Sequence, residues 1–157
     1  DWTERMPVLV QLRRLLPDRL EYLLIRIGLL LNGLGALAGL GFLVVASSGG
    51  TPAALVEAAG PVELPDDPFW LVLMGLVWVI VGGASAVALG LSVFGHRDRA
   101  LALAQYSLLL ALVAGGLLDT YVEQVGALAN ALMQLVLLTL VLDQRSRRKD
   151  QGHPEAA

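Results

Sequence analysis

The sequence contains no cysteine and only two histidines, and these shortages exclude several kinds of chemistry. Without cysteine the chain has no disulfide bond, no thiolate metal site and no cysteine nucleophile. His96 lies in a short polar connection and His153 in a polar tail, so no helix offers two histidines to haem or a metal ion. The serines and threonines of the apolar segments have no histidine or lysine nearby to act as a base. We therefore expect no catalytic residue and no cofactor, and we predict that the protein is not an enzyme.

Charge is missing from the middle of four long apolar stretches. The 157 residues are 56% hydrophobic, and their mean hydropathy is +0.68. Each stretch can cross roughly 30 Å of hydrocarbon as a helix, and none has the alternating pattern of a barrel strand. Gly95, directly after the second stretch, is typical of a helix C-terminal cap. The sequence thus predicts an all-α integral membrane protein with transmembrane helices at residues 23–46, 69–94, 100–118 and 121–142.

Lysine and arginine are confined to three parts of the chain. All eleven lie within residues 5–26, 97–99 and 145–149. The two other connections between apolar stretches contain acidic residues and no basic ones. Because basic residues stay on the cytoplasmic side, we predict a multi-pass protein of the cell (cytoplasmic) membrane with both termini cytoplasmic. Its four spans would form an up-down-up-down antiparallel bundle within a transmembrane domain of residues 23–143.

A signal peptide is the competing interpretation of the first apolar stretch. The segment VVASSGG, residues 44–50, has the small residues of a signal-peptidase site. However, the apolar core before it is longer than the about 7–15 residues of a signal peptide, and its polar start is too long. We therefore interpret this stretch as a membrane span.

An amphipathic helix is predicted in the first cytoplasmic segment, residues 1–22. In VLVQLRRLL, residues 8–16, the apolar side chains share one helical face, and Arg13 and Arg14 lie opposite. This pattern is typical of a helix in the membrane interface, with arginines directed to anionic lipid headgroups. A helix docked under the bundle or on a partner subunit would show the same pattern.

Two further segments lie outside the predicted spans. The outer loop, residues 47–68, contains a predicted short helix at 52–59 between capping residues. The tail, residues 144–157, is basic and then polar, and we expect it to be disordered after about residue 149. Its basic cluster would attract anionic headgroups by about 1 kcal/mol per charge, or would act only to fix the topology. The cluster comprises Arg145, Arg147, Arg148 and Lys149.

Small residues and amides recur at helical spacing in the apolar stretches. Lipid tails are as apolar as leucine, so helices in a membrane associate through close packing and buried polar contacts. Asn130 and Gln134 lie one turn apart, where they could line a polar path or hydrogen-bond to neighbouring helices. The predicted helix-packing residues are Gly28, Asn32, Gly35, Gly39, Gly75, Gly82, Ala86, Gly90, Gly115, Asn130 and Gln134.

Asp119 and Glu123, in the segment LLDTYVEQVG, lie between two runs of apolar residues. Thr120 followed three residues later by Glu123 is a capping box, which marks a helix start. We interpret the pair as part of a turn at headgroup level. A weak cation site that joins the pair to Asp66 or Asp67 is the alternative, and it is the one metal site that the sequence offers.

These features favour a small non-catalytic membrane protein that acts through helix–helix contacts. It would be an accessory or scaffolding subunit of a larger membrane complex, or a homo-oligomer. Its expected partners are membrane lipids and other membrane subunits or further copies of itself, with no nucleic acid. The alternative is a small oligomeric transporter or channel with a polar path along the first and last spans, lined by Asn32, Asn130 and Gln134. A membrane enzyme or quinone-binding subunit is a third class with less support.

Overall fold

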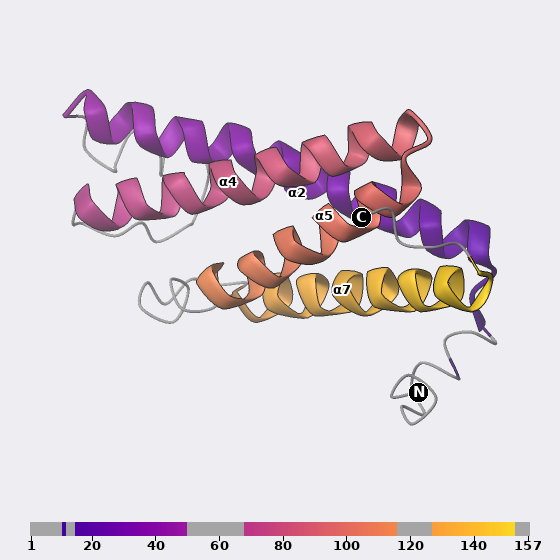
Figure 1. Ribbon diagram of the computed structural model, residues 1–157. Helices are drawn as coiled ribbons and strands as arrows, with labels where there is room; N and C mark the ends of the chain where they lie inside the picture. Colours follow the sequence, from indigo (N-terminus) through magenta and orange to yellow (C-terminus); the bar gives the residue numbers. More distant parts are fainter. Residues whose placement is uncertain (1–10, 12–14, 50–67, 116–126, 153–157) are drawn as a thin grey trace.

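The computed structural model describes residues 11, 15–49, 68–115 and 127–152. Within these residues the protein is entirely helical and contains no strand, as the sequence predicts. The described part of the chain contains four α-helices and one π-helical turn, which follow one another in the sequence (Figure 1). They are α2 (Asp18–Ser47), α4 (Pro68–Val93), α5 (Arg97–Leu110), the π-helical turn η1 (Ala111–Gly115) and α7 (Ala127–Asp150).

Three helical segments are long and apolar enough to span a membrane. They are α2, residues Phe69–Val93 of α4, and α5 together with η1, residues Arg97–Gly115. These segments indicate a membrane-embedded protein, whereas a fourth span and the orientation remain predictions. The 30 residues of α2 rise about 45 Å, which exceeds a hydrocarbon layer of roughly 30 Å. The predicted span starts at residue 23, so the charged first turn of α2 lies outside it.

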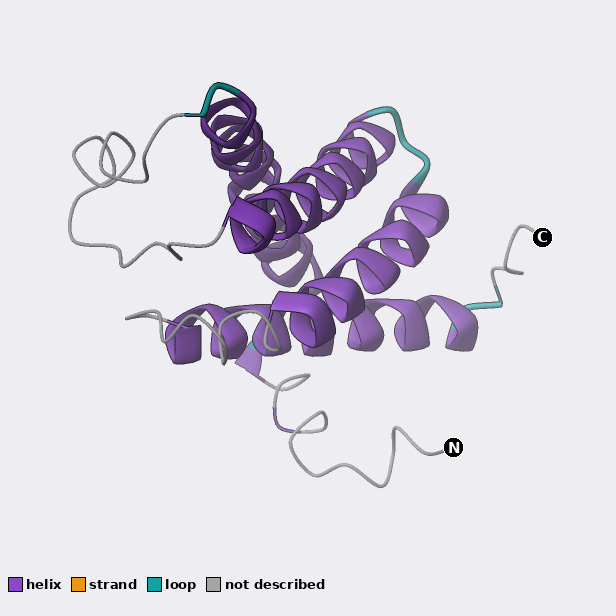
Figure 2. Ribbon diagram, turned by 90° about the vertical axis from the view of Figure 1, so that its left-hand side faces the viewer, coloured by secondary structure: helices purple, strands orange, loops and turns teal. Residues whose placement is uncertain are grey.

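The four described helices form a ring in which each one packs mainly against two others. The contact between α2 and α4 is the most extensive, followed by those of α4 with α5 and of α5 with α7, and α7 closes the ring against α2. α2 and α4 run side by side along their lengths (Figure 1). α7 crosses beneath this pair at an angle and remains extended in a view that foreshortens α2 and α4 (Figure 2). The bundle therefore consists of two pairs of helices, α2 with α4 and α5 with α7. The pairs are inclined to each other and converge at the end where α2 and α5 begin.

Direct backbone contact holds α2 against α4. A Cβ atom added at Gly82 would lie 2.6 Å from the backbone nitrogen of Ala36 and 2.8 Å from the carbonyl oxygen of Asn32. One added at Gly39 would lie 2.7 Å from the carbonyl oxygen of Gly75. No side chain fits at these positions, so glycine is what allows the two helices to pack so closely.

Gly95 ends α4, as the sequence predicts. Its φ of 86° is open to glycine and strained for other residues. The N–H of Gly95 donates to the carbonyl of Ser92 at 3.4 Å, and the N–H of His96 donates to that of Leu91 at 2.8 Å. This pair of bonds is the Schellman motif, which satisfies the last carbonyls of a helix. It reverses the chain so that α5 starts at Arg97, beside the end of α4.

The apolar core lies near the convergent end. Its cluster of buried side chains includes Ile25 and Leu29 of α2, Leu101 and Leu108 of α5, and Val141 of α7. Many other leucines and valines of α2, α4 and α7 face outward and are exposed. Such outward apolar faces suit a lipid environment, where no polar covering is needed.

Candidate functional site

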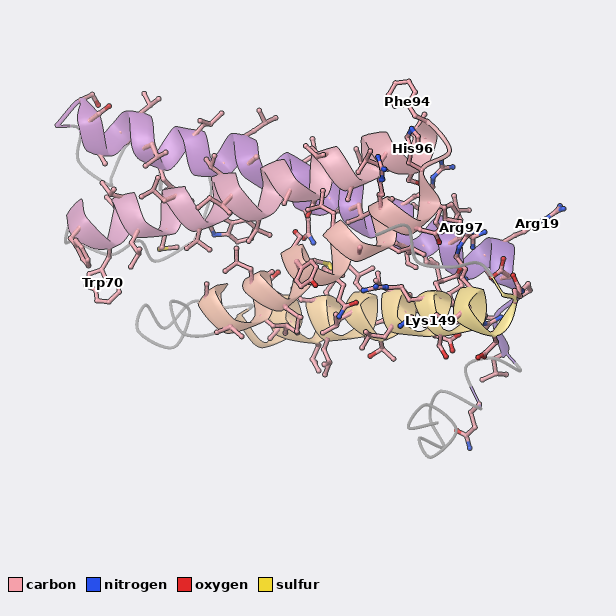
Figure 3. All side chains as sticks on the ribbon, in the orientation of Figure 1. Arg19, Trp70, Phe94, His96, Arg97 and Lys149 are labelled. Atoms are coloured by element: carbon pink, nitrogen blue, oxygen red, sulfur yellow. The ribbon has the colours of Figure 1, made fainter. Side chains whose placement is uncertain are left out.

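Charged side chains from three helices gather where the helices converge. Arg19 of α2, Arg97 of α5 and Lys149 of α7 lie at this end, and Trp70 of α4 lies at the other (Figure 3). The described parts of the three basic segments are thus together at one end of the molecule. We call this end, with the acidic residues that accompany it, the charged end.

The innermost contact of the charged end joins two carboxyl groups to one guanidinium. Arg147 donates from Nη2 to Oε2 of Glu21 at 3.0 Å and from Nε to Oδ2 of Asp143 at 2.7 Å. Both acidic side chains are 0% exposed, and that of Arg147 is 18% exposed. We call Glu21, Asp143 and Arg147 the inner triad. It links the first turns of α2 to the last turns of α7.

Burial makes the charged form of Glu21 costly. Burial raises the pKa of Glu21 from 4.5 to about 7, and the negative charge of Asp143 adds to this shift. The positive charge of Arg147 opposes it and does not overcome it. Oε1 of Glu21 has no hydrogen-bond partner among the residues that the structure describes. One oxygen of the buried Glu21 carboxyl group is therefore left unpaired within the described residues.

A second layer of contacts surrounds the triad nearer to the surface. Gln144 donates from Nε2 to Oδ1 of Asp18 at 2.8 Å, and its own Oε1 accepts from Arg97. Arg97 also donates to Oδ2 of Asp18 at 3.3 Å and stacks over the ring of Tyr22, 4.1 Å from its centroid. Partial burial acts to raise the pKa of Asp18, but the hydrogen bond from Gln144 and the charge of Arg97 lower it overall. This layer ties α2, α5 and α7 together.

The end of α4 joins the charged end through Ser92. Arg26 donates from Nε to Oγ of Ser92 at 2.7 Å and from Nη2 to its carbonyl oxygen at 3.0 Å. The hydroxyl of Tyr22 lies 2.7 Å from the same Oγ. The positive charge of Arg26 at the end of α4 also complements the negative end of that helix's dipole. Arg26 thus directs its charge away from the apolar part of α2 and caps the C-terminal end of α4.

Three of the arginines predicted to face lipid headgroups have partners within the chain. Arg147 belongs to the inner triad. Arg145 donates to Oε1 of Gln105, and Arg148 holds the carboxylate of Asp98 through two nitrogens. Because these contacts draw the basic cluster onto α5 and α2, α7 continues through residues that the sequence assigns to the tail. Binding of lipid by the outer faces of these arginines stays a prediction.

The remaining predicted headgroup residues differ in what the structure says of them. Lys149 is exposed in the last turn of α7, which ends at Asp150. Arg13 and Arg14 lie outside the described residues, as do most of the predicted interfacial helix at 8–16 and the whole short helix of the outer loop. Asp119 and Glu123 also lie outside them. The described residues contain no group of three or more histidine, cysteine, aspartate or glutamate side chains that could hold a metal ion.

A buried amide pair forms a separate polar layer between α2 and α7. Asn32 donates from Nδ2 to Oε1 of Gln134 at 2.9 Å, and Gln134 donates from Nε2 to Oδ1 of Asn32 at 2.8 Å. Both side chains are 2% exposed. The same Nε2 lies 3.3 Å from Oδ1 of Asn130. The structure therefore brings together the three amides that the sequence singles out for packing or for a polar path.

A serine pair provides a matching contact between α4 and α5. Oγ of Ser85 lies 2.9 Å from Oγ of Ser107, which also donates to the carbonyl of Val81 at 3.1 Å. Ser85 is 0% exposed and Ser107 is 3% exposed. Two of the four helix contacts in the ring thus contain an internal hydrogen bond remote from the charged end.

Apolar side chains separate the amide pair from the inner triad. Glu21 and Asn32 are about three turns apart on α2, which is roughly 16 Å of helix rise. Ile25, Leu29 and Val141 of the core lie between them and are almost completely buried. The described polar groups of the α2–α7 contact therefore form two layers and not one continuous path.

The predicted glycines divide into two groups by what surrounds them. A Cβ at Gly28 would collide with the side chain of Leu137 on α7, and one at Gly35 would lie 2.7 Å from the ring of Trp78 on α4. Gly39, Gly75 and Gly82 form the backbone contacts described above. These five glycines therefore pack helices of the same chain.

The other small residues of the predicted set have more open surroundings. Ala86 has its Cβ 3.6 Å from the position of a Cβ at Gly33, which is ordinary contact between α2 and α4. A Cβ at Gly90 or at Gly115 would meet nothing within 4 Å. Gly33, Ala86 and Gly90 line a shallow apolar groove of about 360 Å³ between the two helices. This small-residue face has no partner among the described helices.

The arrangement as a whole offers close packing, paired amides and a buried ionic cluster. It contains no nucleophile beside a base within the described residues. The chain matches no protein-family model, and comparisons with curated proteins and with solved structures find no significant similarity. A functional interpretation therefore depends on the geometry alone.

Proposed function

We propose that the chain is a non-catalytic membrane protein that acts through contacts between its helices and those of other subunits. It serves as an accessory or scaffolding subunit of a larger membrane complex, or it forms a homo-oligomer. Its membrane is the cell membrane, with both termini in the cytoplasm. The observation that carries this proposal is the pairing of Asn32 with Gln134, because the amides in the apolar part are used to join helices of the chain.

The outward faces of the helices support the same proposal. The groove between α2 and α4 is lined almost wholly by apolar atoms and contains the unpartnered Gly90. A second apolar groove, of about 340 Å³, lies between α2 and α7 and is lined by residues such as Leu31 and Val136. In a membrane, small residues on an open face permit the close approach of another helix. These grooves are where a further helix would pack.

Native mass spectrometry of the full chain, extracted gently from its own membranes, tests the proposal. A stoichiometric partner supports an accessory subunit, and a homogeneous multimer of this chain supports a homo-oligomer. Gly90→Leu would fill the groove between α2 and α4, so we expect it to reduce that association. The melting temperature of the isolated Gly90→Leu protomer should stay close to that of the wild-type protomer. A chain that is monomeric in every mild extraction would contradict the proposal.

A small transporter or channel is the second possibility, and the cluster of Asn32, Asn130 and Gln134 is the observation that favours it. The apolar layer between this cluster and the inner triad argues against it, because ions and polar solutes need a continuous polar or hydrated path. The test is flux through liposomes that contain the full chain. Flux that is lost in Asn130→Leu would favour transport, and no flux from the wild type would refute it.

A further inference from the structure

The apolar groove between α2 and α4 follows both helices and ends at the charged end. Its lining residues on α4 extend from Ala86 to Phe94, which is about 12 Å of helix rise. Because α2 and α4 run side by side there (Figure 1), the groove lies along the helix axes. In a chain that spans the membrane, this is also the approximate direction of the lipid acyl chains.

Arg26 places a positive charge at the end of this groove. It lies one turn before the lining residue Leu30 on α2, and it donates twice to Ser92, which directly precedes the lining residue Val93 on α4. Within the described residues its contacts are with neutral groups, namely the hydroxyl and carbonyl of Ser92 and the ring of Tyr22, whose centroid is 5.3 Å away. A guanidinium has five N–H donors, so Arg26 can donate to a further acceptor.

The surroundings of Arg26 favour an anion at headgroup level. The described residues include eight lysines and arginines and five aspartates and glutamates, all in the helical turns of the charged end. The ion pairs described there engage Arg97, Arg147 and Arg148. Phe94, which is 81% exposed, stands at the same end of the groove (Figure 3), and exposed aromatic rings prefer the depth of the headgroups.

We propose that Arg26 and the groove together bind one anionic phospholipid, with its phosphate on the guanidinium and an acyl chain along the groove. From the charged end inward, the surface presents a cation and then apolar side chains. A phospholipid has its phosphate and its acyl chain in the same order. The planar guanidinium pairs well with phosphate oxygens, and the groove of about 360 Å³ is lined almost wholly by apolar atoms.

A lipid at this place would also regulate the association of the chain with other subunits. Its acyl chain covers Gly90, so a further helix packs in the groove only after the lipid has left. This consequence rests on the proposed function, whereas the binding of the lipid does not.

Native mass spectrometry of the full chain with added phospholipids tests the binding on the single protomer. Two lipids with identical acyl chains are compared, anionic phosphatidylglycerol and zwitterionic phosphatidylcholine. We expect the protomer to retain one molecule of phosphatidylglycerol under activation that removes phosphatidylcholine. Equal retention of the two lipids would overturn the proposal without any variant. A chain that is monomeric in every extraction and yet retains the lipid would refute the proposed function and support the lipid site.

Two arginine variants locate the headgroup. Arg26→Gln keeps a donor for Ser92 but removes the charge, so the affinity for phosphatidylglycerol should fall about tenfold. Arg99→Gln removes an exposed charge from α5, which contributes no residue to the groove, and should change the affinity little. Equal losses in both variants would show that the lipid responds to the total charge and not to this site.

Two glycine variants locate the acyl chain. A Cβ at Gly90 or at Gly83 meets nothing within 4 Å, but only Gly90 lines the groove. Gly90→Leu should therefore weaken the retention of both lipids, and Gly83→Leu should not. If Arg26→Gln instead weakens association with another subunit and leaves lipid retention unchanged, Arg26 pairs with a carboxylate of a partner helix and the lipid site is wrong.

Discussion

Asn32 and Gln134 satisfy each other because their two amides face one another with complementary donors and acceptors. Each gives one hydrogen and accepts one, within 2.9 Å. In apolar surroundings no water competes for these groups. The stabilisation measured for such hydrogen bonds between membrane helices is nevertheless modest, about 0.6 kcal/mol on average and about 1.7 kcal/mol at most. Their larger role is to fix which face of α2 meets α7, because any other rotation of the helices leaves an amide unpaired.

Substitution of either amide should therefore cost more than substitution of both. In Gln134→Leu the amide of Asn32 is left buried with unsatisfied groups, and we expect a loss of about 1–3 kcal/mol in the free energy of unfolding. Asn32→Leu should behave likewise, and the double variant should recover part of the loss. Unfolding by a denaturing detergent measures the double-mutant cycle.

Thr139→Val is the matched control for this cycle. Thr139 lies on α7 and donates only within its own helix, to the carbonyl of Leu135 at 2.8 Å. Its replacement should change stability little. If the losses of the two amide variants simply add, with no coupling between them, the pairing contributes nothing and the role assigned to it is wrong.

The sequence identified Asn32 and Gln134 as packing residues but did not identify Glu21 and Asp143. A polar residue inside an apolar run indicates a contact with another helix. Charges at the ends of the run are already explained by the membrane surface and therefore predict no such contact. A signal was nevertheless present. Asp143 and Arg147 are four residues apart on one helix, and Glu21 shares a helical face with Gly28 and Asn32. What the sequence lacks is the information that these two faces meet.

The α2–α4 contact shows how far the packing faces of two helices can be predicted from the spacing of small residues in the sequence. The glycines of both helices were predictable as packing positions, because small residues recur there at helical spacing. The helical spacing favours Gly82 over the adjacent Gly83, but it does not say which of the predicted glycines, such as Gly82 and Gly90, face inside the chain. In the structure a Cβ at Gly82 meets backbone, and one at Gly83 meets nothing within 4 Å.

Gly82→Ala and Gly83→Ala therefore form a matched pair of variants. At Gly82 the new methyl must push α2 away from α4, and we expect a loss of about 1–3 kcal/mol in the free energy of unfolding. At Gly83 the methyl is unopposed, and the better helix propensity of alanine should leave stability unchanged or raise it by up to about 1 kcal/mol. Thermal unfolding of the two variants in one detergent measures the difference. Equal stabilities would contradict the backbone contact between α2 and α4.

Two helix ends were less predictable than the helices themselves. The sequence places the last span at residues 121–142 and assigns its basic cluster to a tail, whereas α7 continues to Asp150. The continuation depends on ion pairs with other helices, which no local pattern reports. Likewise, α5 changes at Ala111 to the π-helical turn η1, and nothing in the apolar sequence there marks that change.

The distribution of charge over the whole molecule gives two explanations for where the basic residues lie. The sequence divides lysine and arginine among three distant segments and predicts that they share one side of the membrane. The structure places the described parts of all three at the charged end, where Arg97 and Arg148 are paired with acidic residues of other helices. Folding, and not only membrane topology, therefore accounts for their being together.

Cysteine labelling separates these two explanations, because the chain has no cysteine of its own. Arg99 and Gln151 are exposed at the charged end, and the pair formed by Asp98 and Arg148 holds their helices together. Arg99→Cys and Gln151→Cys should therefore react with a membrane-impermeant maleimide from the same side of a vesicle. Labelling after detergent permeabilisation controls for the reactivity of each thiol.

Glu57→Cys, in the predicted outer loop, tests the topology itself. If residues 23–46 and 69–94 both cross the membrane, this thiol should react from the side opposite to Arg99→Cys, and the positive-inside rule makes that the outer side. Labelling of Arg99→Cys and Gln151→Cys from opposite sides would contradict the charged end as the structure has it. Labelling of Glu57→Cys from the same side as both would leave the charged end intact and refute the four-span topology. The relative labelling of Arg99→Cys and Gln151→Cys thus tests the fold, whereas the labelling of Glu57→Cys tests how the fold is inserted in the membrane.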